Sequence, residues 1–198
     1  MCHSLRYTVG MDFTGAHALF AHPGKNTDAI GVKPGMVVVD FGAGSGAYIM
    51  HIAELLQGKG KVYAVDIQND LLRRIKNDAE RRGLKVVHTS WGDIEKPRGS
   101  KLPDKCADIV LMSNILFQLD DKRAGLAEAH RILTDNGTLA IIDWTASHGG
   151  LGPQPRDVVH KDAAIVLAHE SGFGLASHFE AGAHHYGLLM KKSEIYAR

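Results

Sequence analysis

The sequence is poor in cysteine and carries no excess charge of either sign. Its two cysteines, Cys2 and Cys106, lie far apart among 198 residues, which argues against a disulfide framework. Cys106 begins an apolar run, which favours a small buried side chain. The 23 basic and 22 acidic residues leave a net charge of +1. That balance gives no reason to expect a nucleic acid or an anionic membrane surface as a partner.

Long apolar stretches are also lacking. No run is long enough to span a bilayer, and residues 1–10 lack the apolar core of a secretory signal. We therefore expect a cytoplasmic protein without membrane contact. The 12 histidines are scattered rather than set at ligand spacing, so no metal is expected. The one adjacent pair, His184 and His185, falls in a predicted strand, where neighbours point to opposite faces.

From residue 36 onward, strand-like and helix-like segments alternate. Apolar runs predict strands at 36–41, 61–67, 84–90, 107–114 and 138–144, and helical periodicity predicts helices at 46–60, 69–83 and 120–133. Such alternation implies parallel strands joined by right-handed crossovers. The sequence therefore predicts an α/β fold, a doubly wound three-layer sandwich, in a chain long enough to bury one full core.

The last third of the chain departs from this pattern. A Gly/Pro-rich loop at 149–155 precedes a predicted helix at 156–172 and two predicted strands, 173–181 and 184–192. The link between these strands is too short for a helical crossover and permits only a hairpin. The mostly parallel sheet should therefore contain one antiparallel strand near its end.

The segment "VVVDFGAGSG" (37–46) joins the first strand to a glycine loop. Its spacing, Gly42-x-Gly44-x-Gly46, differs from the Gly-x-Gly-x-x-Gly of dinucleotide-binding loops. Asp40 stands at the mouth of the loop, where a carboxylate would repel a pyrophosphate but favour an ammonium or sulfonium group. S-adenosylmethionine (SAM) carries both and has no phosphate. The alternative is that Asp40 only caps the following turn.

Polar residues also follow the next three strands. Asp66 ends the second strand, where a carboxylate can accept both ribose hydroxyl protons. Asp93, after Gly92, follows the third strand and could accept the adenine amino group or cap a helix. Asn114 ends the fourth strand, either near the methionine part of SAM or as a turn residue. Because the carboxyl ends of parallel strands share one edge of the sheet, these groups should form one crevice.

The successive segments "VVVDFGAGSG", "VYAVDI", "WGDIE", "ADIVLMSNIL" and "AHRILTDNGTLAIIDW" resemble the motifs of class I SAM-dependent methyltransferases. Within that family the chain is most similar to small methyltransferase-domain proteins related to quinone-biosynthesis methyltransferases. The resemblance implies a seven-stranded Rossmann-like sheet of order 3-2-1-4-5-7-6 with strand 7 antiparallel. It also implies SAM as cofactor, bound by Asp40, Gly42, Ala43, Gly44, Gly46, Asp66, Ile67, Gly92, Asp93, Ile94 and Asn114.

One motif of related enzymes is missing. The Asn-Pro-Pro-aromatic sequence of base and amino-group methyltransferases is replaced by Ser113-Asn114-Ile115-Leu116, which argues against a nucleobase or glutamine target. We expect residues 36–198 to form the methyltransferase domain and 1–35 a cap or lid. Phe13, Phe20 and His22 could belong to that lid or simply pack a leading helix.

The catalytic candidates follow the fifth strand and begin the last one. They are Asp143, His184, His185 and Tyr186, with His148 nearby. One histidine of the 184–185 pair is favoured as a general base, because an imidazole pKa of about 6.5 lies near working pH. The alternative is a strand whose polar residues only meet water.

Three functions remain open at this stage. The leading one is a SAM-dependent methyltransferase acting on a small molecule, as a monomer or homodimer. A SAM-binding domain without catalysis, or one that depends on a partner, is the second. A nucleotide-dependent oxidoreductase is disfavoured by the glycine spacing and by Asp40. Trp91 and Phe117 are predicted to be core residues.

Overall fold

A seven-stranded sheet forms the centre of the computed structural model, which describes residues 21–149 and 151–193. The strand order is β3-β2-β1-β4-β5-β7-β6. The strands are β1 Val37–Phe41, β2 Lys61–Asp66, β3 Val87–Trp91, β4 Ala107–Ser113, β5 Leu133–Trp144, β6 Phe173–Gly182 and β7 His185–Lys192. Neighbours from β3 to β5 are parallel, and β7 is antiparallel to β5 and β6. The predicted order and antiparallel strand are confirmed.

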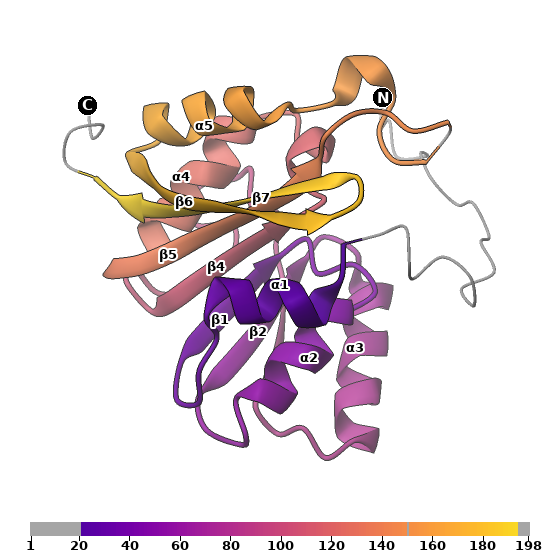
Figure 1. The fold of residues 1–198 in the computed structure, drawn as a ribbon. Coiled ribbons are helices and arrows are strands. Elements are labelled where there is room, and N and C mark those ends of the chain that lie inside the picture. Colours follow the sequence, from indigo (N-terminus) through magenta and orange to yellow (C-terminus); the bar gives the residue numbers. More distant parts are fainter. Residues whose placement is uncertain (1–20, 150, 194–198) are drawn as a thin grey trace.

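Helices cover both faces of this sheet, as the three-layer prediction requires. They are α1 Pro23–Ile30, α2 Ala47–Leu55, α3 Asn69–Arg81, α4 Lys122–Ile132 and α5 Lys161–Glu170, with short 3₁₀ turns at Leu116–Gln118 and Pro155–Asp157. Figure 1 shows α1, α2 and α3 on one side and α4 and α5 on the other. The core is accordingly divided in two, around Ile49 and Ile75 under α1–α3 and around Leu126 and Phe173 under α4–α5.

Strand β1 shows why the apolar runs became central strands. Val38 belongs to the core under α1–α3, and Val39 belongs to the core under α4–α5. Both are fully buried. A strand buried on both faces needs apolar residues at every position rather than at alternate ones.

Several predicted boundaries were wrong; helix α2, for example, ends at Leu55 instead of residue 60. Helix α5 begins at Lys161 instead of residue 156, because His160 is extended (φ −62°, ψ 152°). Strand β5 begins at Leu133 instead of residue 138. Its pairing with β4 shifts register between Ala107 and Ile109, so the residues predicted to form a turn are a bulge within the strand. Strand β3 begins at Val87, after a turn closed by Val87 N–H and Leu84 O.

Helix α1 is hydrogen-bonded both to α2 and to β6. The side-chain amide of Asn26, which is buried, donates to the Tyr48 hydroxyl (2.8 Å) on α2 and to Ala181 O (3.0 Å) on β6. The division into 1–35 and 36–198 stays a prediction. Phe13 and Phe20 lie outside the described residues, and His22 is exposed just before α1. No helix in the described ranges is long and apolar enough to cross a membrane.

Candidate functional site

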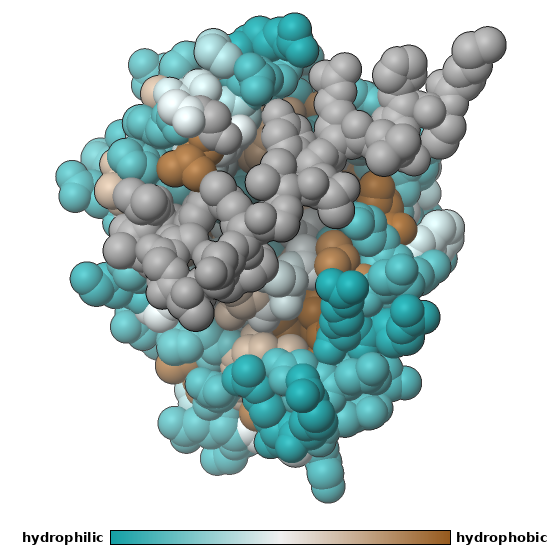
Figure 2. All heavy atoms as spheres, turned by 90° about the vertical axis from the view of Figure 1, so that its right-hand side faces the viewer, coloured by the Kyte–Doolittle hydropathy of each residue, from teal (hydrophilic) through white to brown (hydrophobic). Residues whose placement is uncertain are grey.

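The glycine loop lies between β1 and α2 at the carboxyl edge of the sheet, the edge that faces the viewer in Figure 2. All three glycines have positive φ, 72° at Gly42, 52° at Gly44 and 80° at Gly46, the left-handed region that other residues avoid. The Gly42 amide donates to Val65 O at 2.8 Å. A Cβ at Gly42 would lie 2.6 Å from Ile115 Cδ1. The loop backbone therefore borders the crevice where no side chain fits.

Asp66 holds the glycine loop directly. Its carboxylate, almost fully buried, accepts the Gly44 amide (3.0 Å) on one oxygen and the Gln68 amide (2.8 Å) on the other. A carboxylate oxygen accepts more than one hydrogen bond, so Asp66 keeps acceptor capacity for a ligand hydroxyl. Its position between loop and crevice matches the predicted ribose contact, which stays a prediction.

A cavity of about 290 Å³ opens beside these groups, close to the lower limit of about 300 Å³ for small-molecule sites. Seven of the predicted cofactor residues line it: Gly42, Gly44, Asp66, Ile67, Gly92, Asp93 and Ile94. Asp40, Ala43, Gly46 and Asn114 do not. Residues that sequence reasoning missed complete the wall: Val65, Gln68, Glu95, Ile115, Gln118 and Leu119. Most of these are close chain neighbours of predicted site residues, and that proximity is the one signal that could have found them.

Asp40 lies behind the glycine loop with 2% of its surface exposed. Burial, together with the nearby Asp66 carboxylate, raises the pKa of Asp40 to about 8. Among the described residues its carboxylate accepts no hydrogen bond, so the cost of burial is not offset by a partner. A cationic ligand group beside the loop would relieve this cost, as the sequence-based hypothesis requires.

The loop after β3 presents Asp93 to the cavity. Asp93 accepts the Glu95 amide at 3.0 Å, which fixes the turn. Trp91 was predicted to be core, but it is 49% exposed; its indole N–H donates to Ile67 O at 2.9 Å. Ile67 itself is 62% exposed and lines the cavity. The tryptophan therefore supports the rim of the site instead of filling the interior.

Beyond the cavity, the carboxyl ends of β4 and β5 carry polar atoms without partners. Asn114 has a positive φ of 55°, and its buried side-chain oxygen accepts no hydrogen bond. Its backbone is fixed, because its amide donates to Ile142 O at 2.8 Å. Figure 2 shows hydrophobic side chains in separate patches at this end of the molecule, with hydrophilic residues between and around them.

The structure separates the four catalytic candidates. Asp143 is fully buried and accepts the amides of Leu116 (3.1 Å) and Trp144 (2.8 Å), and burial raises its pKa to about 7. The buried Tyr186 hydroxyl donates to Val159 O at 2.8 Å. Tyr186 belongs to the core under α4–α5, and Asp143 is its partner in the β5–β7 pairing. Both therefore lie on the α4–α5 face.

His184 and His185 take different positions. His184 lies in the turn before β7, with its ring 3.9 Å from that of His148 between centroids. His185 begins β7 and is 2% exposed. Its ring packs against that of Trp144, with 4.3 Å between the ring centroids. Burial, with the nearby His184 and His148, lowers the pKa of His185 to about 4. The reason for favouring His185 as a base, a pKa near working pH, does not hold at this site.

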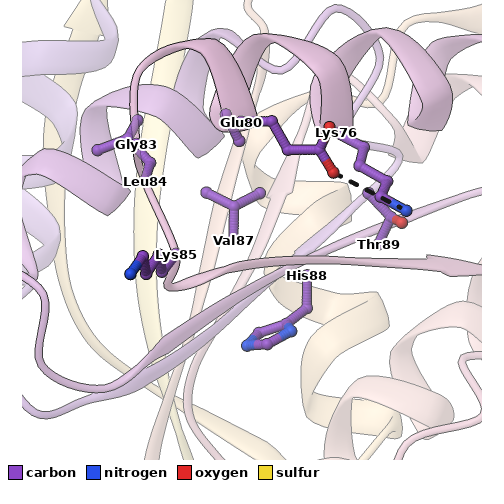
Figure 3. A pocket seen from close by; sticks show the side chains of 9 residues that line it. Lys76, Glu80, Gly83, Leu84, Lys85, Val87, His88 and Thr89 are labelled. Atoms are coloured by element: carbon purple, nitrogen blue, oxygen red, sulfur yellow. Dashed lines mark ion pairs between the residues drawn. The ribbon is translucent and has the colours of Figure 1, made fainter.

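A larger hollow of about 580 Å³ lies elsewhere, between α3 and the amino-terminal half of β3. Figure 3 shows its side chains, with Lys76 and Glu80 paired at 4.0 Å along α3. None of its lining residues comes from the glycine loop or from the carboxyl ends of the strands. It holds no unpartnered buried polar atom of the described residues, so it is not the candidate site. The described ranges contain no cluster of metal-ligating side chains.

The geometry can be compared with known proteins. A family model described as a methyltransferase domain matches residues 32–194. The chain belongs to this family. Its sheet order 3-2-1-4-5-7-6 is that of the class I SAM-dependent methyltransferases, the type of enzyme for which SAM is the cofactor.

Individual relatives agree with this family assignment. A SAM-dependent methyltransferase from Aquifex aeolicus is 27% identical with a TM-score of 0.80, covering 89% of this chain and 92% of that one. The ubiquinone/menaquinone biosynthesis C-methyltransferase UbiE of Shewanella oneidensis is 28% identical over 115 residues, 58% of this chain and 45% of UbiE. The chain thus spans about half the length of the curated relatives it matches.

One further solved structure is similar to this chain in fold alone. The [4+2]-cyclase SpnF is 14% identical with a TM-score of 0.72, covering 86% of this chain and 80% of that one. The fold therefore serves more than one reaction, and the reaction of this protein has to be argued from its site.

Proposed function

We propose that the protein transfers the methyl group of SAM to a small-molecule acceptor. The observation that carries the proposal is the convergence of Asp66 and Asp93, from two neighbouring strand ends, with the glycine loop around one cavity, while Asp40 lies buried behind that loop. Asp66 would hold the ribose hydroxyls, and Asp93 with Ile67 and Ile94 would hold the adenine. Asp40 would stand near the amino-acid or sulfonium charge, and Gly42, Ala43, Gly44, Gly46, Gly92 and Asn114 would supply close backbone contacts.

When bound, SAM would supply an activated methyl group, an electrophilic carbon attached to a positively charged sulfur. The protein's own share of such a reaction is positioning and exclusion of water. The rigid hydrogen bonds of Asp66 to Gly44 and Gln68 serve positioning. The acceptor would lie beyond the loop, over β4, β5 and β7, where the side-chain oxygen of Asn114 and the His185 ring are buried.

Cofactor binding is tested first, by calorimetry of the full chain with SAM and with S-adenosylhomocysteine. Asp66→Ala should weaken both by about 1.5–3 kcal/mol, the range for a lost hydrogen bond to a charged group. Asp70→Ala is the matched control, because Asp70 is an exposed carboxylate one turn away, paired only with Arg73. NADH at a hundredfold excess over the SAM dissociation constant should not compete. Unchanged affinity in Asp66→Ala, or displacement by NADH, contradicts the proposed site.

Catalysis is tested separately, by incubating the protein with methyl-labelled SAM and fractionated cell extract. Label appearing in a small molecule supports the proposal and identifies the acceptor. Tight SAM binding without transfer to any fraction would favour the alternative, a SAM-binding domain that needs a partner. The oligomeric state and a cytoplasmic location stay predictions.

A further inference from the structure

The unpartnered buried polar atoms of the described residues gather in one place. They are Ser113 Oγ, Asn114 Oδ1, His148 Nε2 and both ring nitrogens of His185. Ser113 lies beside the Tyr48 hydroxyl but without hydrogen-bonding geometry. All five atoms belong to the carboxyl ends of β4 and β5, the loop after β5, or the start of β7. Folded proteins satisfy nearly all buried polar groups, so five such atoms at one edge indicate a ligand that completes them.

The sheet register places several of these groups on one face. Asp40 pairs with Leu111, two residues before Ser113; Ser113 pairs with Ile142, two residues before Trp144; and Trp144 pairs with His185. Paired residues and residues two apart in a strand share a face. Leu111 and Ile142 belong to the core under α1–α3, so Asp40, Ser113 and His185 all lie on that face. Asp143 and Tyr186 lie on the other.

The charges around this face restrict its ligand. The ionisable groups that shift the pKa of His185 are His184 and His148, and the group that shifts that of Asp40 is Asp66. No lysine or arginine is among them, so an anionic ligand would find no cation from these groups. Burial keeps His185 neutral at pH 7, and a neutral imidazole offers one N–H donor and one acceptor nitrogen. A hydroxyl, which donates one hydrogen bond and has two lone pairs with which to accept, is its complement.

We propose that His185, with His148, Ser113 and Asn114, forms the acceptor subsite, and that it recognises an uncharged molecule through a hydroxyl group. This inference rests on the proposed function, because only a methyltransferase has a methyl acceptor. In it His185 orients the hydroxyl by hydrogen bonding and holds no charge. Trp144 fixes the imidazole, because the centroids of the Trp144 and His185 rings are 4.3 Å apart. The indole is packed in turn against Gly152 of the neighbouring loop, where an added Cβ would lie 2.7 Å from it.

The test uses the full chain with ¹⁵N-labelled histidine, saturated with S-adenosylhomocysteine, and three simple probes at pH 7.5. Phenol is uncharged there, because a phenolic hydroxyl has a pKa of about 10. Anisole has the same ring but no donor, and benzoate is anionic. We expect phenol to move both His185 ring-nitrogen resonances and to bind about fivefold more tightly than anisole, the value of one neutral hydrogen bond. Benzoate should bind more weakly than either.

Variants assign the effect to the cluster. His185→Phe should remove the preference for phenol over anisole, whereas His178→Phe, at an exposed site on β6, should keep it. His185→Gln retains a donor and an acceptor, so it should keep part of the preference and serves if the Phe variant does not fold. Equal binding of phenol and anisole, tightest binding of benzoate, or an unchanged preference in His185→Phe overturns the inference. Failure of S-adenosylhomocysteine to bind counts against the proposed function instead, and phenol titration without it still tests the cluster.

Discussion

Asp66 and His185 are both buried polar residues at the carboxyl edge of the sheet, yet their surroundings differ. Asp66 and its neighbours on the cofactor side are held by backbone amides: Gly44 and Gln68 donate to Asp66, and Glu95 donates to Asp93. On the acceptor side His185 has no partner for either ring nitrogen. Asp66 and Asp93 therefore have hydrogen-bond partners before any ligand arrives, whereas His185 leaves both ring nitrogens for the ligand. Specificity for the acceptor is therefore expected to depend on β4, β5 and β7.

The largest effect should come from filling the glycine loop. Gly42→Val places a β-branched residue at φ 72° with its Cβ 2.6 Å from Ile115 Cδ1. Left-handed strain and overpacking together should lower the free energy of unfolding by about 3–5 kcal/mol and abolish SAM binding. Urea unfolding and calorimetry measure the two effects. If SAM still binds normally, the loop does not border the cofactor.

Gly58→Val is the control for that substitution. Gly58 has nearly the same φ, 74°, but nothing within 4 Å of an added Cβ. It should cost only the backbone strain, about 1–2 kcal/mol, and leave SAM affinity unchanged.

Asp40→Asn should separate stability from binding. The folded-state pKa of Asp40, about 8, is raised above the ordinary 3.8 by burial. Its contribution to stability is therefore full below pH 4 and is lost as the pH rises through 8. At pH 8 the variant should be more stable than the wild type by about 2 kcal/mol or more, and nearly equal at pH 4. SAM should bind about tenfold more weakly.

Urea unfolding at several pH values checks this prediction, with Asp70→Asn, an exposed site, as the control. Asp143, whose pKa is raised to about 7, acts in the same direction and is present in both proteins. A stability difference that does not change between pH 4 and pH 8 would show that Asp40 is not protonated by burial.

Substitutions at two adjacent residues of β7 compare the two faces of the sheet and should have smaller effects on stability. Tyr186→Phe leaves Val159 O without its 2.8 Å donor and should lower the free energy of unfolding by about 1 kcal/mol. His185→Phe removes two unpartnered nitrogens and should be neutral or slightly stabilising, although it removes acceptor recognition. Thermal and urea unfolding of both variants decide this. The opposite order of stabilities would mean that His185 is a structural residue.

The smallest effect should come from the rim of the cofactor side. Trp91→Phe keeps the ring but removes the N–H that holds Ile67 O, which should weaken SAM binding by about 0.5–1 kcal/mol. Lys101→Met, which removes the ammonium 4.2 Å from the Trp91 ring centre, should change affinity by less. Calorimetry on both variants, compared at one salt concentration, ranks them. An unaltered affinity in Trp91→Phe would show that the Ile67 backbone needs no such support.

Most of the fold was predictable because each signal was local. The apolar runs located β1, β2 and β4, and the short link after residue 182 required the hairpin that makes β7 antiparallel. The errors arose where tertiary context overrides a local signal. The Asp-Asn-Gly sequence at 135–137 is typical of a turn, yet pairing of Leu133 with Ala107 continues β5 through it as a bulge.

The site was predictable on the cofactor side and less so on the acceptor side. Glycines and acidic residues at strand ends are visible in the sequence, and seven of the proposed contacts line the cavity. The residue at which β7 begins decides which core is faced by each of His184, His185 and Tyr186. No sequence pattern identifies that first residue. Nor does the sequence reveal burial, which lowers the pKa of His185 to about 4 and removes the argument for a basic imidazole.

The position of β7 between β5 and β6 has a consequence for the order in which the protein matures on the ribosome. Residues emerge from amino to carboxyl end at about 5–20 per second, so the segments that build the cofactor crevice, all within residues 37–119, appear well before the hairpin. β6 has no strand to join until β7 follows it, and the Asn26 contact with Ala181 closes only then. It follows that a nascent chain gains its cofactor crevice first and its acceptor face last.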